Sequence, residues 1–338
     1  MTPVVRPIRP DDTDALYRMA RGTGGGFTNL PADRPTLSAK VERAIASFAR
    51  ADDTPADDLF LFVLEDADRG EVRGTCQIFA RIGSTWPFYS YRIGVLTQIS
   101  TELDRTFRAE TLTLCTDLDG ATEVGGLFLD ADARSAGTGK LLARSRYLFM
   151  ALHRPRFASR TIAELRGALD EAGDSPFWNG LAGRFFGMSF READEFNAIH
   201  GNQFIADLMP RHPIYTSMLV DTARQRIGVP HRSGEAAMRM LEHEGFSFDC
   251  YIDIFDGGPT MIVDTDRIAT VREARSERIA AIAEPAAGTI SLVATGRLSR
   301  YRCCQDLIAP AGDGIALSPV AADVLGVTVG DTVTHVPV

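Results

Sequence analysis

Apolar residues recur along this chain with two spacings, one typical of strands and one typical of helices. Short runs rich in apolar and β-branched residues predict strands, whereas apolar residues three and four positions apart predict helices. The predicted strands cover residues 4–8, 59–64, 74–80, 111–115, 123–129, 161–166, 251–255 and 260–263. The predicted helices cover residues 14–20, 37–49, 139–152, 176–186, 203–209, 213–227 and 233–244. Further short strands are expected at 290–294, 300–304, 314–318 and 332–336.

The order of these elements predicts an α+β fold, with a mixed, mostly antiparallel sheet and flanking helices. Strands and helices do not alternate strictly, as they would in a doubly wound domain. We expect a first domain over residues 1–195, a helical and strand extension over 196–280, and a small β-barrel-like module over 288–338. Residues 81–110 are interpreted as an insertion, and the Ala/Pro-rich residues 281–287 as a linker.

A glycine-rich turn, Arg134-Ser-Ala-Gly-Thr-Gly139, separates a predicted strand from a predicted helix. The first N–H groups of a helix and the helix dipole attract anions, and glycines let the backbone approach them closely. Arg134, Lys140, Arg144 and Arg146 cluster around the turn in the sequence and could provide the local basic patch that an anionic group needs. The turn therefore suits a pyrophosphate group, although an ordinary strand–turn–helix with a glycine cap has the same local pattern.

Composition and charge narrow the class of protein. The chain has 338 residues, 45% of them hydrophobic, and a net charge of −9. This charge disfavours nucleic acid and mildly favours a small cationic substrate. No apolar run is long enough for a membrane-spanning helix. Five cysteines without regular spacing argue against a disulfide framework, and the sequence predicts no metal site. We expect a cytoplasmic protein.

The glycine-rich turn resembles the acyl-CoA pyrophosphate loop of the GNAT superfamily of N-acyltransferases, whose pattern is [QR]-x-x-G-x-[GA]. Several longer segments resemble the arginine N-succinyltransferase family. These segments are residues 21–31, 62–66, 122–132, 163–178, 184–190, 208–215 and 251–260. The resemblance implies a GNAT-like fold, with a degenerate second acyltransferase unit in the extension as an alternative.

The same resemblance implies transfer of a succinyl group from succinyl-CoA to the α-amino group of L-arginine, in arginine breakdown. Succinyl-CoA would be a co-substrate, and no permanently bound cofactor is expected. The chain would form a homo-oligomer or pair with a related subunit. Two alternatives stay open: an N-acyltransferase for ornithine or another amino acid, and a weakly active regulatory subunit.

Site residues follow partly from chemistry and partly from the resemblance. Backbone N–H groups at the end of strand 123–129 are expected to hold the thioester oxygen and the pantetheine arm. The family places its succinyl-CoA contact at the position of Leu127. The residues expected to bind succinyl-CoA are Leu127, Leu129, Arg134, Gly137, Thr138, Gly139 and Lys140.

Two residues are candidates for proton transfer. The family places its proton donor in I-G-x-x-H, which matches His231, and an imidazole titrates near neutral pH. Glu123 is the second candidate, because many acyltransferases of this superfamily carry a base on this strand. Glu123, Gly125 and Leu127 are expected to alternate onto one face. Whether His231 or Glu123 carries the proton stays open.

The acceptor site is less defined by the sequence. Gly24, Gly25 and Gly26 lie where this fold closes over the acceptor, and their backbone is expected to contact it. A guanidinium group calls for a carboxylate. The carboxylates available for it are Glu164, Asp170, Asp253 and Asp256. Arg92 and Arg184 are the candidates for binding the succinyl carboxylate.

Overall fold

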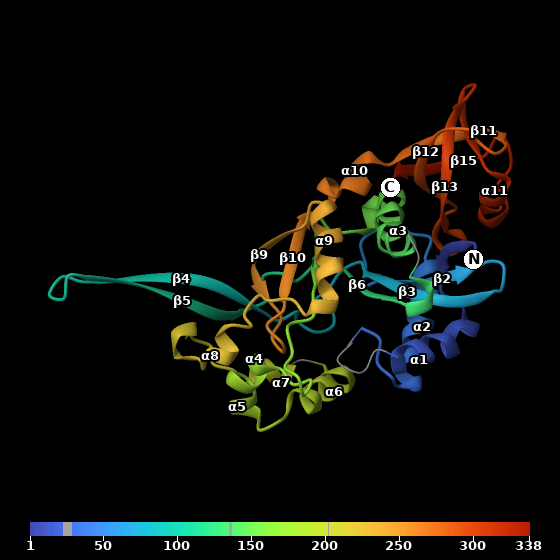
Figure 1. Ribbon diagram of the computed structural model, residues 1–338. Coiled ribbons are helices and arrows are strands. Elements are labelled where there is room, and N and C mark those ends of the chain that lie inside the picture. The colour runs from blue at the N-terminus through green and yellow to red at the C-terminus, as the bar shows by residue number, and fades with distance from the viewer. Residues whose placement is uncertain (23–28, 135–136, 202) are drawn as a thin grey trace. The chain divides into compact units, whose positions relative to one another are not determined.

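The computed structural model of the chain describes residues 1–22, 29–134, 137–201 and 203–338. The chain forms two compact units, each assembled from segments that are far apart in the sequence (Figure 1). Unit 1 comprises Met1–Ala80, Thr122–Ser159 and Asp264–Val338, and unit 2 comprises Arg81–Ala121 and Arg160–Val263. The predicted domains, in contrast, are continuous stretches of sequence. Across the described ranges, no helix is both long and apolar enough to cross a membrane.

The first part of unit 1 is an antiparallel sheet with the strand order β1-β2-β3-β6. Its strands are β1 (Pro3–Pro7), β2 (Leu59–Asp66), β3 (Glu71–Phe79) and β6 (Thr122–Leu129). Its helices are α1 (Thr13–Gly22), α2 (Arg34–Ala49) and α3 (Thr138–Leu152). Strand β2 is apolar on both faces: Leu61 belongs to the core formed with α1 and α2, whereas the Phe62 ring contacts Phe149 of α3.

The C-terminal part of unit 1 is a small closed barrel. Its elements are α10 (Ala269–Glu273), β11 (Arg275–Ile282), β12 (Thr289–Thr295), β13 (Arg302–Ala311), β14 (Gly314–Leu317), α11 (Pro319–Leu325) and β15 (Thr332–Pro337). The strand order is β12-β15-β11-β14-β13, and pairing of β13 with β12 closes the circle. The module predicted from residue 288 thus begins earlier, because Ala281 and Ile282 pair with β14 and are not a linker.

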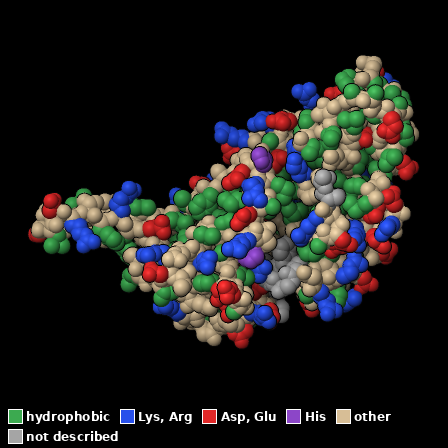
Figure 2. Space-filling view, viewed as in Figure 1, with side chains coloured by type: hydrophobic (Ala, Val, Ile, Leu, Met, Phe, Trp, Pro, Cys, Tyr) green, Lys and Arg blue, Asp and Glu red, His purple; other side chains and the backbone are tan. Residues whose placement is uncertain are grey.

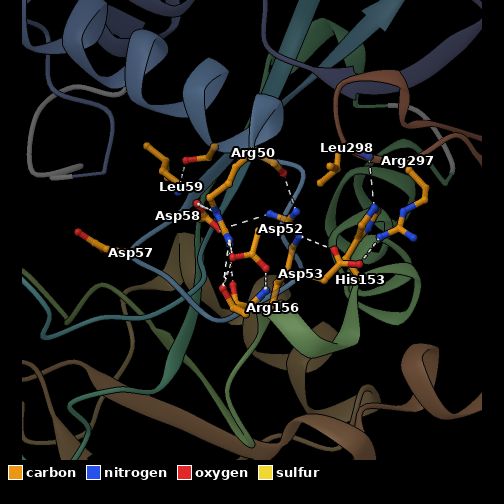
Figure 3. Close-up of polar contacts among 12 residues, drawn as sticks. Arg50, Asp52, Asp53, Asp57, Asp58, Leu59, His153, Arg156, Arg297 and Leu298 are labelled. Carbon is orange, nitrogen blue, oxygen red and sulfur yellow. Dashed lines mark hydrogen bonds and ion pairs between the residues drawn. The ribbon is translucent and has the colours of Figure 1, made fainter.

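A network of ion pairs and hydrogen bonds joins the barrel to the rest of unit 1 (Figure 3). The Asp53 carboxylate binds Arg156 at 2.9 Å and Arg297 at 2.7 Å. The backbone N–H of Leu298 donates to Nε2 of His153 at 3.2 Å. Because Arg156 and His153 are fully buried, these contacts fix the end of α3 against the barrel.

Unit 2 has its own strands in the order β7-β10-β9-β4-β5-β8. The strands are β4 (Ser90–Ser100), β5 (Arg105–Cys115), β7 (Arg160–Glu164), β8 (Ile214–Tyr215), β9 (Ser247–Ile252) and β10 (Pro259–Asp264). The helices are α4 (Pro176–Gly180), α5 (Gly183–Phe186), α6 (Phe190–His200), α7 (Gln203–Leu208), α8 (Asp221–Arg224) and α9 (Glu235–His243). Trp178 and Phe177 lie at the centre of its core.

Strands β4 and β5 form a long hairpin, paired from Ser90–Cys115 to Ser100–Arg105. The hairpin projects from the rest of unit 2 (Figure 1), and hydrophobic side chains and charges of both signs cover it (Figure 2). The sequence predicts only residues 111–115 as a strand here. Apolar and polar residues alternate imperfectly in the part of β5 that precedes residue 111. Backbone pairing with β4 extends the strand over this part.

Two predicted helices differ in the structure. Residues 213–227 do not form one helix, because Ile214 and Tyr215 pair with β5 instead, and only a 3-10 turn at Thr216–Met218 and the short helix α8 follow. Residues 176–186 form the two short helices α4 and α5. A Cβ at Gly180 would lie 2.4 Å from the Cβ of Ala223, so glycine is needed where α4 packs on α8.

Candidate active site

Helix α3 begins at the glycine-rich turn that is predicted to bind an anion. Gly137 precedes the helix with a φ of +94°, a conformation that favours glycine. Within the described residues, no side chain caps this helix N-terminus. Arg134 and Lys140 are exposed at the turn, whereas Ser135 and Ala136 lie outside the described residues. The turn thus combines an uncapped helix N-terminus with two cations, as a phosphate group requires.

The room available for a side chain differs between the two glycines of the turn. A Cβ at Gly137 would come within 2.7 Å of Oε1 of Gln305, which belongs to the C-terminal barrel. A Cβ at Gly139 would meet no atom within 4 Å, whereas Thr138 is buried. The open side of the turn is therefore at Gly139.

Two arginines of α3 do not contribute to the basic patch expected around the turn. Arg146 is buried, and its guanidinium donates to the carbonyl oxygen of Gly125 at 3.2 Å. Arg144 donates to the carbonyl oxygen of Pro337 at 2.9 Å. Both residues hold parts of unit 1 together, so the expectation that they face an anion is wrong.

A β-bulge interrupts β6 where the acyl donor is predicted to bind. The β3–β6 ladder pairs Gln77 with Gly125 and Thr75 with Phe128. Two residues of β6, Gly126 and Leu127, therefore lie opposite the single residue Cys76. Gly126 has a φ of +57°, and a Cβ there would lie 2.9 Å from the side chain of Gln77. The bulge depends on glycine at this position.

The bulge changes which side chains of β6 share a face. Paired residues of neighbouring strands point to the same side, so Glu123 and Gly125 are followed on their face by Phe128. The predicted alternation of Glu123, Gly125 and Leu127 is therefore wrong beyond Gly125. The contact of Leu127 and Leu129 with succinyl-CoA stays a prediction. The bulge changes the direction of the backbone at Leu127.

Glu123 is only 6% exposed and lies among polar side chains of unit 1. Burial lowers the pKa of Lys40 to about 7, and the charge of Glu123 opposes this shift. The Lys40 ammonium donates to the carbonyl oxygen of Asn29, and Nε2 of Gln77 donates to Oδ1 of Asn29 at 2.7 Å. Glu123 thus has a neighbour that titrates near neutral pH, which is typical of sites that exchange protons.

His231 belongs to unit 2 and is fixed by two backbone contacts. Its own N–H donates to the carbonyl oxygen of Arg166 at 2.7 Å. Its Nδ1 accepts the backbone N–H of Ser233 at 3.2 Å, so a neutral ring carries its proton on Nε2. Burial and the charges of Arg166 and Arg232 lower the pKa of His231. At neutral pH the ring is therefore uncharged and presents an Nε2–H donor.

Two of the carboxylates considered for the guanidinium are used by the backbone. Oδ2 of Asp256 accepts the N–H of Gly167 at 2.7 Å, and Oδ1 accepts the N–H of Gly258 at 2.9 Å. Oδ1 of Asp170 accepts two N–H groups of its own turn. These bonds give both residues a structural role and argue against them as guanidinium ligands.

Glu164 is half-buried at the end of β7, and Asp253 directly follows β9. Asp253 lies near Asp194 of α6, a residue that the sequence analysis missed. Burial and the charge of Asp253 raise the pKa of Asp194 to about 6. No sequence signal distinguishes Asp194 from the other charged positions of the helix, because its proximity to Asp253 is a tertiary contact.

The other residues predicted to bind the acceptor or the succinyl carboxylate do not define the site further. Gly24, Gly25 and Gly26 lie outside the described residues. Arg92 is exposed and lies 3.6 Å from Asp117, with which it forms an ion pair. Arg184 is exposed on α5. Neither arginine lies in an enclosed site within unit 2.

An antiparallel sheet, a bulged strand and a glycine-rich turn before a helix are the features expected of a GNAT-like N-acyltransferase fold. Two family models match the chain. The model described as "Arginine N-succinyltransferase beta subunit" matches residues 3–270, and that described as its C-terminal domain matches residues 272–337. The chain belongs to the arginine N-succinyltransferase family.

Individual relatives agree with this family. Arginine N-succinyltransferases of Escherichia coli and Shigella flexneri are 42% identical over 332 residues, covering 98% of this chain and 96% of theirs. A solved structure of arginine/ornithine succinyltransferase subunit AI from Pseudomonas aeruginosa superposes with a TM-score of 0.91 at 33% identity. The superposition covers 99% of this chain and 98% of that one. The family and the fold class expected from the sequence are confirmed.

Proposed function

We propose that this chain transfers the succinyl group of succinyl-CoA to the α-amino group of L-arginine, giving N2-succinylarginine and CoA. The observation that carries the proposal is similarity to arginine N-succinyltransferases at 42% identity over nearly the full chain. The glycine-rich turn at α3 supports it, because acyl transfer from a CoA thioester needs a site for the pyrophosphate.

The reaction joins two substrates by aminolysis of a thioester. The neutral α-amino nitrogen attacks the thioester carbonyl carbon, a C–N bond forms, and the C–S bond breaks as CoA leaves. One proton leaves the amine, and one is taken up by the leaving thiolate. The enzyme must therefore hold the donor, stabilise the oxyanion and move a proton.

In our proposal the turn at Arg134, Gly137, Thr138, Gly139 and Lys140 binds the pyrophosphate of succinyl-CoA. The bulge in β6 turns the backbone at Leu127 toward the thioester, where an N–H group would stabilise the oxyanion. A backbone donor explains why an apolar residue occupies this position.

Glu123 and His231 are the two candidates for proton transfer. Glu123 would accept the proton of the amine, directly or through a water, and its burial next to Lys40 supports such a role. His231 would donate from Nε2, a role supported by the Ser233 contact that places the proton there. Each residue is proposed on the geometry of its own unit.

The proposal is tested by measuring CoA release from succinyl-CoA with the purified chain. Arginine should be a better acceptor than ornithine, and succinyl-CoA a better donor than acetyl-CoA. Ornithine preference would favour the alternative acceptor, and no release with either amino acid would favour a regulatory subunit.

We also propose that the chain works as an oligomer, of identical chains or with a related subunit, in the cytoplasm. The β4–β5 hairpin exposes Val95, Ile99, Leu103 and Phe107, and a two-stranded ribbon is only marginally stable alone. The five cysteines are free, as in a reducing compartment. Sedimentation equilibrium would give the mass of the assembly.

A further inference from the structure

Unit 1 contains a cavity of about 870 Å³ that the proposed reaction does not use. Its walls come from the end of β1 and the residues that follow it, the last turns of α2, the segment 295–302 between β12 and β13, and the end of α11. The cavity therefore lies where the barrel meets the N-terminal sheet. A volume of this size is typical of sites for small organic molecules.

The cavity lies at the opposite end of α3 from the glycine-rich turn. The turn precedes Thr138, the first residue of α3. The segment 295–302 instead contacts His153, which follows the last residue of the helix, because the N–H of Leu298 donates to Nε2 of His153 at 3.2 Å (Figure 3). Helix α3 has 15 residues and is therefore about 22 Å long. A ligand in the cavity would not occupy the turn.

Positive charge is concentrated in the walls of this cavity. Among the described residues, its lining includes no Asp or Glu and five arginines, namely Arg6, Arg9, Arg297, Arg300 and Arg302. The chain as a whole has a net charge of −9. A recess lined by one sign of charge raises the local concentration of ions of the opposite sign. The cavity is thus a basic site on an acidic protein.

Two of the five arginines are paired with carboxylates outside the lining. Arg6 is buried, lies 2.7 Å from Asp12 and also binds Glu65. Arg297 lies 2.7 Å from Asp53, within the network that joins the barrel to the rest of unit 1 (Figure 3). These two arginines hold the walls together.

The other three arginines keep most of their charge available. Arg300 is exposed, and neither it nor Arg302 forms an ion pair within 4.0 Å in the described part of the chain. One guanidinium nitrogen of Arg302 donates to the carbonyl oxygen of Val324 at 2.7 Å, which leaves its other N–H groups for a ligand. Arg9 is exposed and lies 3.9 Å from Glu65, so this pair is weak.

Apolar side chains complete the lining. Ile45 and Phe48 belong to α2, Tyr301 precedes β13, and Leu325 ends α11. A hydrated inorganic ion would gain nothing from these side chains, whereas the carbon frame of an organic molecule would be removed from water against them. The lining therefore suits an organic molecule that also carries negative charge.

The segment that carries Arg297 and Arg300 has an unusual backbone. Leu298 has a φ of +50°, which is uncommon for a residue with a side chain. Its hydrogen bond to the buried His153 holds this conformation. Backbone of this kind is found at ligand sites, where it fixes the contacting groups before the ligand arrives.

We propose that this cavity binds a small organic anion with two or more negative charges, carried by phosphate or carboxylate groups. Arg9, Arg300 and Arg302 contact the charged groups, because a guanidinium fork fits both phosphate and carboxylate. The site is separate from the turn at α3 and goes beyond the proposed function. A ligand held here touches both the barrel and the N-terminal sheet, so its binding stabilises unit 1.

The test titrates two anions separately into the wild-type chain by calorimetry. ATP represents organic phosphates and citrate represents organic carboxylates, while adenosine is the neutral control. Each titration is made with and without saturating CoA, so that binding at the turn is recognised by its loss. At least one anion should bind in the presence of CoA, raise Tm and bind more weakly at high salt, and adenosine should not bind.

Arg300→Gln locates the binding. This variant should fold normally because the side chain is exposed and unpaired in the described structure, and it should weaken anion binding about 3- to 30-fold. CoA affinity and kcat should not change. Arg278→Gln, an exposed arginine of β11 outside the cavity, is the matched control and should change the affinity by less than about twofold.

Three results would overturn the inference. The first is that neither ATP nor citrate binds at concentrations of about 10 mM. The second is that CoA abolishes all anion binding, which would place it at the turn. The third is an equal loss of affinity in Arg300→Gln and Arg278→Gln, which would show attraction by the overall charge alone. None of these results depends on whether arginine is the acceptor, so the proposed function is tested separately.

Discussion

The backbone N–H of Ser233 points at Nδ1 of His231, with 3.2 Å between the two nitrogens. The same Nδ1 lies 2.7 Å from Oγ of Ser233. Only an unprotonated Nδ1 can accept the backbone N–H, so the neutral ring is held in the tautomer with hydrogen on Nε2. This tautomer presents an Nε2–H group, as the proposed role of His231 as a proton donor requires.

We predict that His231→Ala lowers kcat by about 10²- to 10⁴-fold, the usual effect of losing a positioned acid or base. CoA affinity, measured by calorimetry, should stay within about twofold. His231→Gln keeps an N–H donor and should recover part of the lost rate if hydrogen-bond donation is what matters. His243→Ala, on the neighbouring helix α9, is the control. A normal kcat in His231→Ala would contradict the assignment.

Glu123→Gln should lower kcat strongly if this carboxylate accepts the amine proton. Glu123 also supports the charged form of Lys40, so the variant should bring the pKa of Lys40 below its present value of about 7. Any inflection near neutral pH that Lys40 contributes to the pH–rate profile should therefore move to lower pH in Glu123→Gln. Thermal unfolding of Glu123→Gln shows whether a low kcat comes from lost proton transfer or from a destabilised fold. If Glu123→Gln turns over normally while His231→Ala is impaired, His231 alone carries the proton transfer.

Gly137→Asp should weaken CoA binding sharply, because it puts a carboxylate where an anion is expected. Any side chain here is strained, since φ is +94° and a Cβ would meet Gln305 at 2.7 Å. Gly137→Ala therefore serves as the steric control. Affinity measured by calorimetry should fall more for Asp than for Ala, and the excess should shrink at high salt. Equal losses in the two variants would mean that the turn is only structural.

The buried ring of His153 should make the fold sensitive to acid. Its Nδ1 binds the carbonyl oxygen of Phe149 at 2.9 Å, and its Nε2 accepts the N–H of Leu298. Burial lowers the pKa of His153 from 6.5 to about 4. Between these values the unfolded chain binds a proton that the folded chain does not, so stability present above pH 6.5 is lost as pH falls toward 4.

The size of this loss in the free energy of unfolding follows from the pKa shift of His153. It is about 3 kcal/mol once the pH has fallen through the whole range between the two pKa values. Urea unfolding of the wild type and of His153→Phe, followed from pH 7 to pH 4, measures it. The variant should be less stable at pH 7 but should lose less stability on acidification. Parallel curves for the two proteins would show that another group is responsible.

The sequence by itself determined those features that depend on neighbours along the chain. The apolar run in β2, the glycine-rich turn before α3 and the short strands of the barrel follow from local periodicity and turn chemistry. The segments that resemble the arginine N-succinyltransferase family determined the class of reaction. They also singled out His231 and Leu127 as candidates, which local pattern alone would not do.

Only the tertiary structure decided which side chains come together. An extra residue in β6 separates Leu127 from the face of Glu123, and this bulge is defined only by how β6 pairs with β3. Long-range carbonyl contacts remove Arg144 and Arg146 from the basic patch, and pairing with β5 turns Ile214 and Tyr215 from helix to strand. Asp194 gains its neighbour Asp253 across 59 residues of chain, because packing, not sequence distance, sets which charges interact.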